Sequence, residues 1–101
     1  MNEPADRMRI DVWLWRARFF KTRTLASDAV AENGARIERD GQVRRIDKAS
    51  VTVQAGDRLS FAAPSGGYVV AILSLPHRRG PPAEAAQAYE VIDRRQPDRS
   101  A

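Results

Sequence analysis

The sequence of 101 residues has no cysteine and a single histidine, His77. Without cysteine the chain has no disulfide, thiolate zinc site, iron–sulfur cluster or cysteine nucleophile. His77 stands next to Pro76 and Arg78 with no carboxylate or nucleophile beside it, which is a poor arrangement for catalysis or metal binding. We therefore expect a protein that is not an enzyme, holds no metal or other cofactor, and takes no small-molecule substrate.

Long apolar segments are also missing. No stretch approaches the roughly 18 apolar residues of a membrane span, and the first residues include acids and no apolar run of signal-peptide length. We expect a cytoplasmic protein that makes no membrane contact. The composition is 43% apolar and 30% charged, which is typical of a soluble globular chain. The length suits one domain with one small core, and we expect a monomer.

The charge is distributed unevenly. Seventeen bases, fifteen of them arginine, stand against thirteen acids and give a net charge of +4. Residues 7–23 hold six of the bases and one acid, so this window carries +5 while the rest of the chain sums to −1. Aromatic residues lie among these bases. Because arginine forms planar forks for phosphate and aromatic rings stack on unpaired bases, the window favours nucleic-acid binding over the alternative of a solvated helix face.

The first predicted helix spans residues 11–19. Asp11 serves as its cap or first-turn acid, and Ile10, Leu14 and Ala17 form its buried stripe. Trp13 and Trp15 lie about 200° apart on a helix, so they face different sides. We expect Trp13 in the core and Trp15 partly exposed. The two following aromatic residues, Phe19 and Phe20, are expected to pack in the core and to form a hydrophobic staple, an apolar contact at the start of the next helix.

The second predicted helix spans residues 23–33. Thr22 is its expected N-cap, and Gly34 ends it because glycine tolerates the left-handed conformation. Four residues at helical spacing form its apolar face: Leu25, Ala26, Ala29 and Val30. Both helices are too short to be stable alone in water, so each must pack on another element.

After Gly34 the pattern becomes that of β-strands. Residues 36–39 and 42–45 flank Asp40-Gly41, a preferred two-residue turn, and predict a hairpin. Residues 51–53, 58–61 and 68–75 predict further strands, with turns at 55–57 and 64–67. Asp57 is interpreted as a structural turn carboxylate. Residues 76–82 predict a stiff linker, and 83–92 predict a terminal helix with Ala85, Tyr89 and Ile92 facing inward.

Several of these segments resemble the S4 RNA-binding domain, in its branch similar to heat shock protein 15. The general pattern matches at residues 9–11, 22–23, 34, 40–41 and 56–57. The runs RIDVWLW at 9–15 and ARFFKTR at 17–23 narrow the resemblance to that branch, as do residues 78–79, 82–86 and 89–90. The resemblance covers roughly residues 9–92. It implies an α+β fold in which two helices pack on a small, bent, mainly antiparallel sheet, followed by a C-terminal helix.

The resemblance also implies a function and a site. It implies contact with structured ribosomal RNA on the large (50S) subunit, in the rescue or recycling of stalled nascent-chain complexes under stress. The residues that it assigns to RNA contact are Arg9, Arg16, Arg18, Lys21, Thr22 and Arg23. Further arginines are interpreted either as a second, weaker contact or as solubilising charges: Arg78, Arg79, Arg94, Arg95 and Arg99.

Two alternatives remain beside this reading. The first alternative is a DNA-binding helix-turn-helix regulator, because such a protein also has two helices joined by a short turn with basic residues. In that fold the second helix lies in the major groove of DNA, and here the second helix carries the acids Asp28 and Glu32, which disfavours this alternative. A generic binder of structured RNA or tRNA is the other. The expected organisation is a flexible leader (1–8), the RNA-binding domain (9–75), a linker with a C-terminal helix (76–92) and a disordered tail (93–101).

Overall fold

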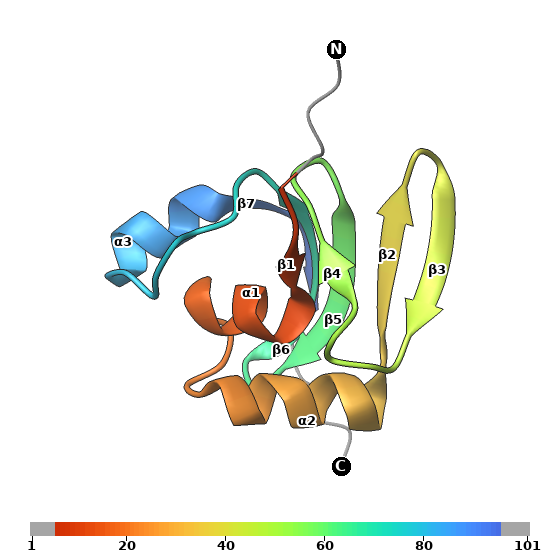
Figure 1. Cartoon of the computed structure of the whole chain (residues 1–101), viewed down its shortest axis with the longest axis horizontal. Helices are drawn as coiled ribbons and strands as arrows, with labels where there is room; N and C mark the ends of the chain where they lie inside the picture. Colours follow the sequence, from red (N-terminus) through yellow and green to blue (C-terminus); the bar gives the residue numbers. More distant parts are fainter. Residues whose placement is uncertain (1–5, 96–101) are drawn as a thin grey trace.

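The computed structural model describes residues 6–95, in which a helix pair is followed mainly by strands (Figure 1). The helices are α1 (Ile10–Arg16), α2 (Arg23–Asn33), α3 (Pro82–Ala85) and the 3-10 turn η1 (Ala86–Ala88). The strands are β1 (Met8–Arg9), β2 (Ala35–Arg39), β3 (Gln42–Ile46), β4 (Thr52–Val53), β5 (Arg58–Ala63), β6 (Gly66–Ile72) and β7 (Tyr89–Arg95). Most of the expected leader and tail lies outside the described residues, but Met8 belongs to β1 and residues 93–95 belong to β7.

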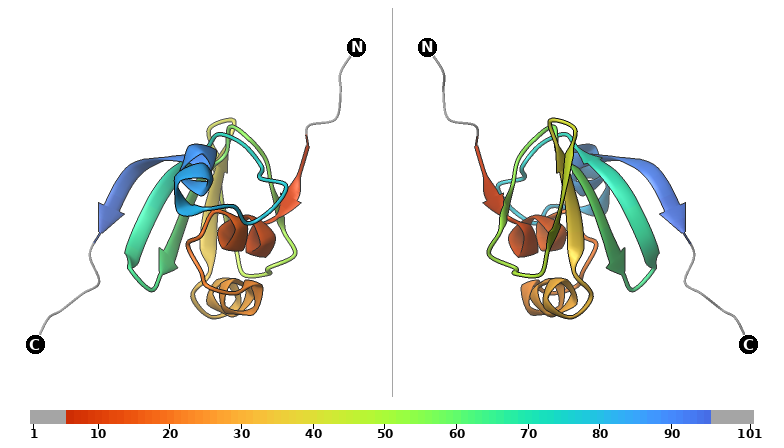
Figure 2. Two further views of the ribbon diagram at one scale, coloured as in Figure 1. Left: turned by 90° about the vertical axis from the view of Figure 1, so that its left-hand side faces the viewer. Right: turned by 90° about the vertical axis from the view of Figure 1, so that its right-hand side faces the viewer.

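Five of the strands form one antiparallel sheet in the order β3-β2-β5-β6-β7. The two remaining strands, β1 and β4, pair with each other in a separate antiparallel ribbon. Figures 1 and 2 show α1 in front of the middle of the curved sheet and α2 across one end of it. The predicted α+β class, with helices on a small, bent, mainly antiparallel sheet, is confirmed.

Helix α1 begins as predicted but ends earlier. Its buried residues include the predicted Ile10 and Leu14 together with Trp13. The helix ends at Arg16, not at Phe19, because Arg18 adopts a left-handed φ of 70°. Phe19 N–H then donates to Leu14 O at 3.0 Å and Arg18 N–H to Trp15 O at 3.1 Å, which is the bonding pattern of a Schellman cap. This early turn directs Phe19 into the aromatic cluster described below.

Helix α2 has the predicted bounds and both predicted caps. Thr22 Oγ1 accepts a hydrogen bond from Leu25 N–H at 3.0 Å, and Gly34 closes the helix with a φ of 75°. One part of the predicted apolar face is wrong. Leu25 is 48% exposed, since α2 crosses only one end of the sheet and faces the core with Ala26 and Val30.

The predicted β2–β3 hairpin is confirmed around Asp40-Gly41. Asp40 and Gly41 have φ values of 54° and 77°, the left-handed conformations that a two-residue hairpin turn of type I′ requires. The strands pair from Ala35 opposite Ile46 to Arg39 opposite Gln42. Of the later predicted strands, residues 51–53 contribute β4, which pairs with β1 instead of joining the main sheet. This pairing was not predicted because β1 has only two residues.

The core lies between the helix pair and the sheet and is centred on Trp13. This side chain is fully buried, and its Nε1–H donates to Ser74 O at 3.0 Å. Phe19 packs beside it and contacts the rings of Phe61, Tyr68 and Tyr89 with centroid distances of 4.7–5.0 Å. Burial, with a smaller contribution from Tyr68, raises the pKa of the Tyr89 phenol. The predicted core positions of Trp13, Phe19 and Phe20 are confirmed.

The predicted terminal helix over residues 83–92 is too long. Only α3 and η1 are helical, and the chain from Tyr89 onward forms β7, which pairs antiparallel with β6. Ala85 is buried as predicted, whereas Ile92 is 44% exposed on the strand. If the helix continued, the backbone N–H and C=O groups at the edge of β6 would have no strand to pair with. Strand β7 supplies those partners, so tertiary context overrides the local alanine-rich pattern. Within residues 6–95 no helix is long and apolar enough to cross a membrane.

Candidate nucleic-acid interface

Two of the predicted contact residues, Arg9 and Arg23, meet at the buried carboxylate of Asp11. Arg9 Nε and Nη2 donate to the two oxygens of Asp11 at 3.1 and 3.0 Å, and Arg23 Nε lies 3.6 Å from Asp11 Oδ2. Asp11 is 2% exposed, while the side chains of Arg9 and Arg23 are 45% and 51% exposed. The carboxylate thus fixes two arginines from different elements and leaves about half of each in solvent.

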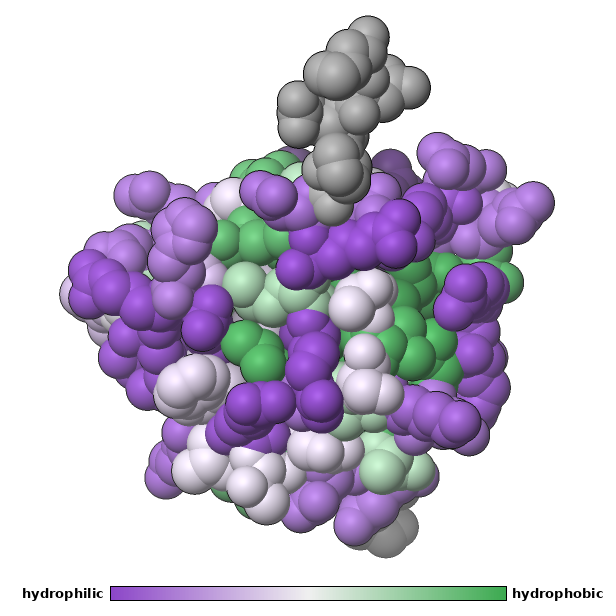
Figure 3. Space-filling view, in the orientation of Figure 1, coloured by the Kyte–Doolittle hydropathy of each residue, from purple (hydrophilic) through white to green (hydrophobic). Residues whose placement is uncertain are grey.

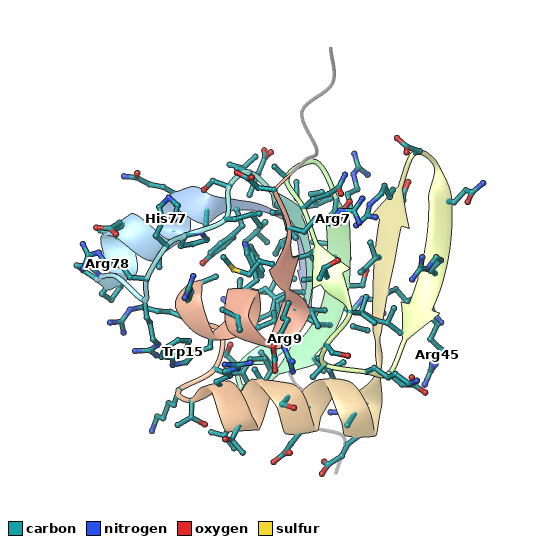
Figure 4. All side chains as sticks on the ribbon, viewed as in Figure 1. Arg7, Arg9, Trp15, Arg45, His77 and Arg78 are labelled. Carbon is teal, nitrogen blue, oxygen red and sulfur yellow. The ribbon has the colours of Figure 1, made fainter. Side chains whose placement is uncertain are left out.

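Asp11 connects this pair to the start of α1. Its Oδ1 also accepts a hydrogen bond from Val12 N–H at 2.8 Å, so the carboxylate is a first-turn acid as predicted. The hydrogen bond to Asp11 raises the pKa of Arg9 above its ordinary value, at which an arginine is already charged throughout the physiological pH range. Figure 4 shows Arg9 in the space between α1 and α2, where a ligand lying across both helices would meet it.

Lys21 and Thr22 lie in the connection between α1 and α2, and both are exposed. Thr22 accepts the capping bond from Leu25 N–H, and a hydroxyl that accepts one bond can still donate its own hydrogen. Lys21 directly precedes this cap, next to the positive end of α2. The connection therefore adds two donors beside Arg23.

The other two predicted residues, Arg16 and Arg18, are engaged elsewhere. Arg16 Nη1 donates to Pro76 O at 2.9 Å, and Arg18 Nε donates to Gly80 O at 2.6 Å. Both bonds hold the 76–80 segment against the end of α1. The side chain of Arg18 is exposed, so its charge is accessible to a phosphate from solvent, whereas that of Arg16 is partly buried. The structure does not bring these two residues to Asp11, so the six predicted residues fall into two groups.

Arg79 has a structural role that the sequence pattern did not single out. Its Nε donates to Trp15 O at 3.1 Å and its Nη2 to Phe20 O at 3.4 Å. Trp15 O also accepts the hydrogen bond from Arg18 N–H that closes the helix, and a cation near the carbonyl groups at a helix end complements the helix dipole. Arg78, by contrast, forms an exposed pair with Glu84 at 3.0 Å. The two neighbouring arginines therefore serve different purposes.

We expect Arg79→Ala to lower the free energy of unfolding by about 1–2 kcal/mol, because the charge-assisted bonds to Trp15 O in α1 and to Phe20 O in the connection to α2 are lost. Arg78→Ala is the matched control and should change it by less than about 0.5 kcal/mol, as an exposed ion pair stabilises little. Urea unfolding followed by circular dichroism measures both. Equal effects of the two substitutions would contradict the structural role of Arg79.

The remaining surface features agree with the sequence in part. Trp15 is partly exposed as predicted, and Figure 4 shows it near the end of α1. Arg94 donates to Ser65 O at 3.4 Å and lies 5.3 Å from the centroid of the Tyr68 ring, and Arg99 lies outside the described residues. Figure 3 shows a largely hydrophilic surface with a small apolar patch over α1 and a larger apolar area between the β4 segment and the β2–β3 hairpin. Among residues 6–95, no three histidine or acidic side chains gather as a metal site would require.

Comparison with known proteins identifies the relatives of this chain, although no protein-family model matches it. It is 34% identical over 89 residues to heat shock protein 15 of Escherichia coli strain K12, an alignment that covers 88% of this chain and 63% of that protein. The chain thus spans less than two thirds of the length of that relative. It is 33% identical over 96 residues to a heat shock protein 15 homolog of Aeromonas salmonicida, covering 92% of this chain and 69% of the homolog.

A solved structure agrees with these sequence relationships. The trimeric structure of Vibrio cholerae heat shock protein 15 superposes with a TM-score of 0.69 at 30% identity, over 85% of this chain and 82% of that one. The arrangement of two N-terminal helices on an antiparallel sheet is therefore shared with a relative of known structure. On sequence and fold together, this chain belongs to the heat shock protein 15 family.

Proposed function

We propose that this protein is a non-enzymatic RNA-binding protein with an S4-type helix pair as its binding surface. The observation that carries the proposal is the pairing of Arg9 and Arg23 on the buried Asp11. A buried carboxylate that holds two half-exposed guanidinium groups fixes their geometry before a ligand arrives. Planar guanidinium groups fixed in this way suit the oxygens of neighbouring phosphates. Lys21 and Thr22 extend the same surface with further donors, and the exposed Arg18 adds a positive charge separately at the end of α1.

We further propose that the RNA is ribosomal RNA of the large subunit, and that the protein acts in the cytoplasm in the rescue or recycling of stalled nascent-chain complexes. Membership of the heat shock protein 15 family supports a stress-related role. The S4-like motif residues at 9–11 and 22–23 support the choice of structured RNA. We propose that the protein binds as a monomer and needs no cofactor.

A DNA-binding regulator fits the structure less well. A helix-turn-helix protein inserts its second helix into the major groove, so the exposed side of that helix must tolerate phosphate. The corresponding helix here is α2, and it exposes Asp28 and Glu32. The bases lie instead at its start and before α1. Binding to structured RNA without a ribosomal role is the remaining alternative, and the experiment below separates it.

The test is sedimentation of the tagged protein through a sucrose gradient of cell lysate. We expect the wild-type protein to migrate with free large subunits and the Arg9→Gln/Arg23→Gln variant to remain at the top. The matched control is Arg36→Gln/Arg58→Gln, which removes the same charge from the opposite side of the sheet: both residues are exposed, and each adjoins a buried residue that faces the core. This variant should still migrate with large subunits.

Other outcomes assign the function differently. A wild-type protein that stays at the top of the gradient contradicts the ribosomal role, and binding of a purified RNA hairpin then supports the generic RNA binder. Preference for duplex DNA over that hairpin supports the regulator. Circular dichroism spectra of both double variants establish that any loss of binding does not come from unfolding.

A further inference from the structure

A groove of about 360 Å³ lies between the β2–β3 hairpin and the β1–β4 ribbon. Ligand sites for small molecules typically span roughly 300–1,000 Å³, so this volume admits one small ligand and not a folded partner. None of the six residues assigned to RNA contact from the sequence lines it. Figure 4 shows Arg7 beside the hairpin at the edge of this region.

The hairpin wall of the groove combines arginine with an apolar base. Directly opposed residues of an antiparallel pair point to the same side, and the register places Ile37 opposite Arg44 and Arg39 opposite Gln42. All four residues line the groove. Ile37 is 5% exposed, so it forms the apolar base, while Arg44 and Gln42 stand exposed at the rim.

Arg39 is fixed in place at this wall. Its Nε and Nη2 donate to the two carboxylate oxygens of Asp57, each at 2.7 Å, and Asp57 is 1% exposed. Asp57 Oδ2 also accepts a hydrogen bond from Gln54 N–H at 3.0 Å, which ties the carboxylate to the turn before β5. The groove therefore contains a guanidinium group with a fixed orientation, in the same way that Asp11 orients Arg9 and Arg23.

The opposite wall continues into the candidate interface. Arg7, Val51 and Thr52 line the groove there, and Thr52 lies directly opposite Arg9 in the β1–β4 ribbon. Arg7 precedes β1 by one residue and is two residues from Arg9, so the extended chain carries both side chains on one side. A nucleic-acid strand lying on Arg9 would thus reach the groove without a gap in positive charge.

The charge and polarity of the lining indicate the chemistry of the ligand. Arg39 is neutralised by its ion pair with Asp57, so Arg7 and Arg44 against Asp40 leave the groove with a net positive charge that suits an anion. Ile37 and Val51 give it an apolar base that a free phosphate would not use. Gln42 and Thr52 offer both donors and acceptors at the edges. A phosphate joined to a flat, apolar and hydrogen-bonding group matches all three features.

We propose that this groove holds one unpaired nucleotide of the bound RNA, with its phosphate on Arg7 and Arg44 and its base against Ile37 and Val51. Gln42 and Thr52 bind the edge of the base, and Arg39 fixes the wall on which it lies. The inference rests on the proposed RNA binding through Arg9 and Arg23. It adds a preference for RNA that carries an unpaired nucleotide. A surface that binds only phosphates lacks this preference, because base contacts are what distinguish an unpaired nucleotide from a paired one.

The test compares two RNA hairpins with the same stem, one fully paired and one with a single-stranded 3′ extension of three nucleotides. Fluorescence anisotropy at 50 mM salt gives the affinity of the full-length protein for each. We expect the wild-type protein to prefer the extended hairpin about tenfold, the order of a single base contact. Arg44→Ala should reduce this preference to about twofold or less while the fully paired hairpin remains bound.

The matched control is Arg45→Ala. This substitution removes the same charge from the neighbouring residue of β3, whose side chain points to the other face of the sheet, where it lines a separate hollow with Arg36 and Ser60. It should leave the tenfold preference in place. Gln42→Ala provides a second groove variant should Arg44→Ala fail to fold, and we expect it to lower the preference at least threefold.

Each remaining outcome overturns the proposal at an identifiable point. A wild-type protein that binds both hairpins equally lacks the nucleotide site but retains the proposed RNA binding. Equal losses for Arg44→Ala and Arg45→Ala mean that charge alone, and not the groove, determines the preference. A wild-type protein that binds neither hairpin contradicts RNA binding itself, and the groove proposal with it.

Discussion

Raising the salt concentration from 50 to 200 mM should weaken binding of this protein to an RNA hairpin roughly sixtyfold. Each phosphate neutralised by a basic side chain releases counterions, so the logarithm of affinity falls linearly with the logarithm of salt concentration. About four contacts, from Arg9, Arg18, Lys21 and Arg23, imply a slope of about −3. Fluorescence anisotropy with one labelled hairpin over this salt range measures the slope directly.

Single substitutions assign that slope to particular residues. Arg23→Ala should reduce its magnitude by about one, since one phosphate contact is lost. Arg16→Ala should change it little, because Arg16 is partly buried and donates to Pro76 O. Arg58→Ala, on the far face of the sheet, is the control for loss of charge alone. An equal reduction for Arg23 and Arg58 would mean that the basic window is only a solvated helix face.

Some elements of the fold could be predicted from residues that are neighbours in the sequence. Thr22 caps α2 and Gly34 ends it through interactions within four residues of the chain. Asp40-Gly41 forms the β2–β3 turn because few other dipeptides adopt two consecutive left-handed conformations at low cost. The burial of Trp13 together with Ile10 and Leu14 follows from helical spacing alone. These features depend little on the rest of the fold.

The carboxyl-terminal strand required information from a distant segment. Residues 83–92 place alanine and apolar residues at helical spacing, yet Tyr89, Val91 and Ile92 also have strong β-propensity. Both patterns are present in the sequence. The choice depends on the unpaired edge of β6, which lies about twenty residues away along the chain and accepts β7 as its partner. A prediction made from one window therefore favoured the helix.

The candidate site also combines features that neighbouring residues determine with features that depend on distant segments. Asp11 was predicted as a first-turn acid, but its contact with Arg23 depends on how α2 packs against α1. Arg16 and Arg18 bind carbonyl oxygens of residues about sixty positions later, which no local spacing reveals. Their assignment to RNA contact remains a prediction, as does that of the other four residues. The structure makes Arg9 and Arg23 the first pair to test.

The two tryptophans of α1 should respond very differently to replacement by alanine. Trp13 is fully buried, hydrogen-bonded to Ser74 O and in contact with the rings of Phe19 and Tyr89. Trp13→Ala leaves a large cavity and removes that bond, so we expect a loss of about 4 kcal/mol in the free energy of unfolding. Small domains are stable by roughly 5–15 kcal/mol, so this variant should be close to unfolding at 37 °C.

Trp15→Ala is the matched control, since it removes the same side chain two residues later from the partly exposed side of α1. We expect it to cost about 1 kcal/mol. Urea unfolding followed by far-ultraviolet circular dichroism gives both values, and the folded Trp15→Ala protein is then available for RNA titration. An unchanged RNA affinity in that variant means that Trp15 does not stack on a base. A destabilisation by Trp15→Ala as large as that by Trp13→Ala would contradict the orientation of α1 against the sheet, and with it the position of Arg9 and Asp11 at its start.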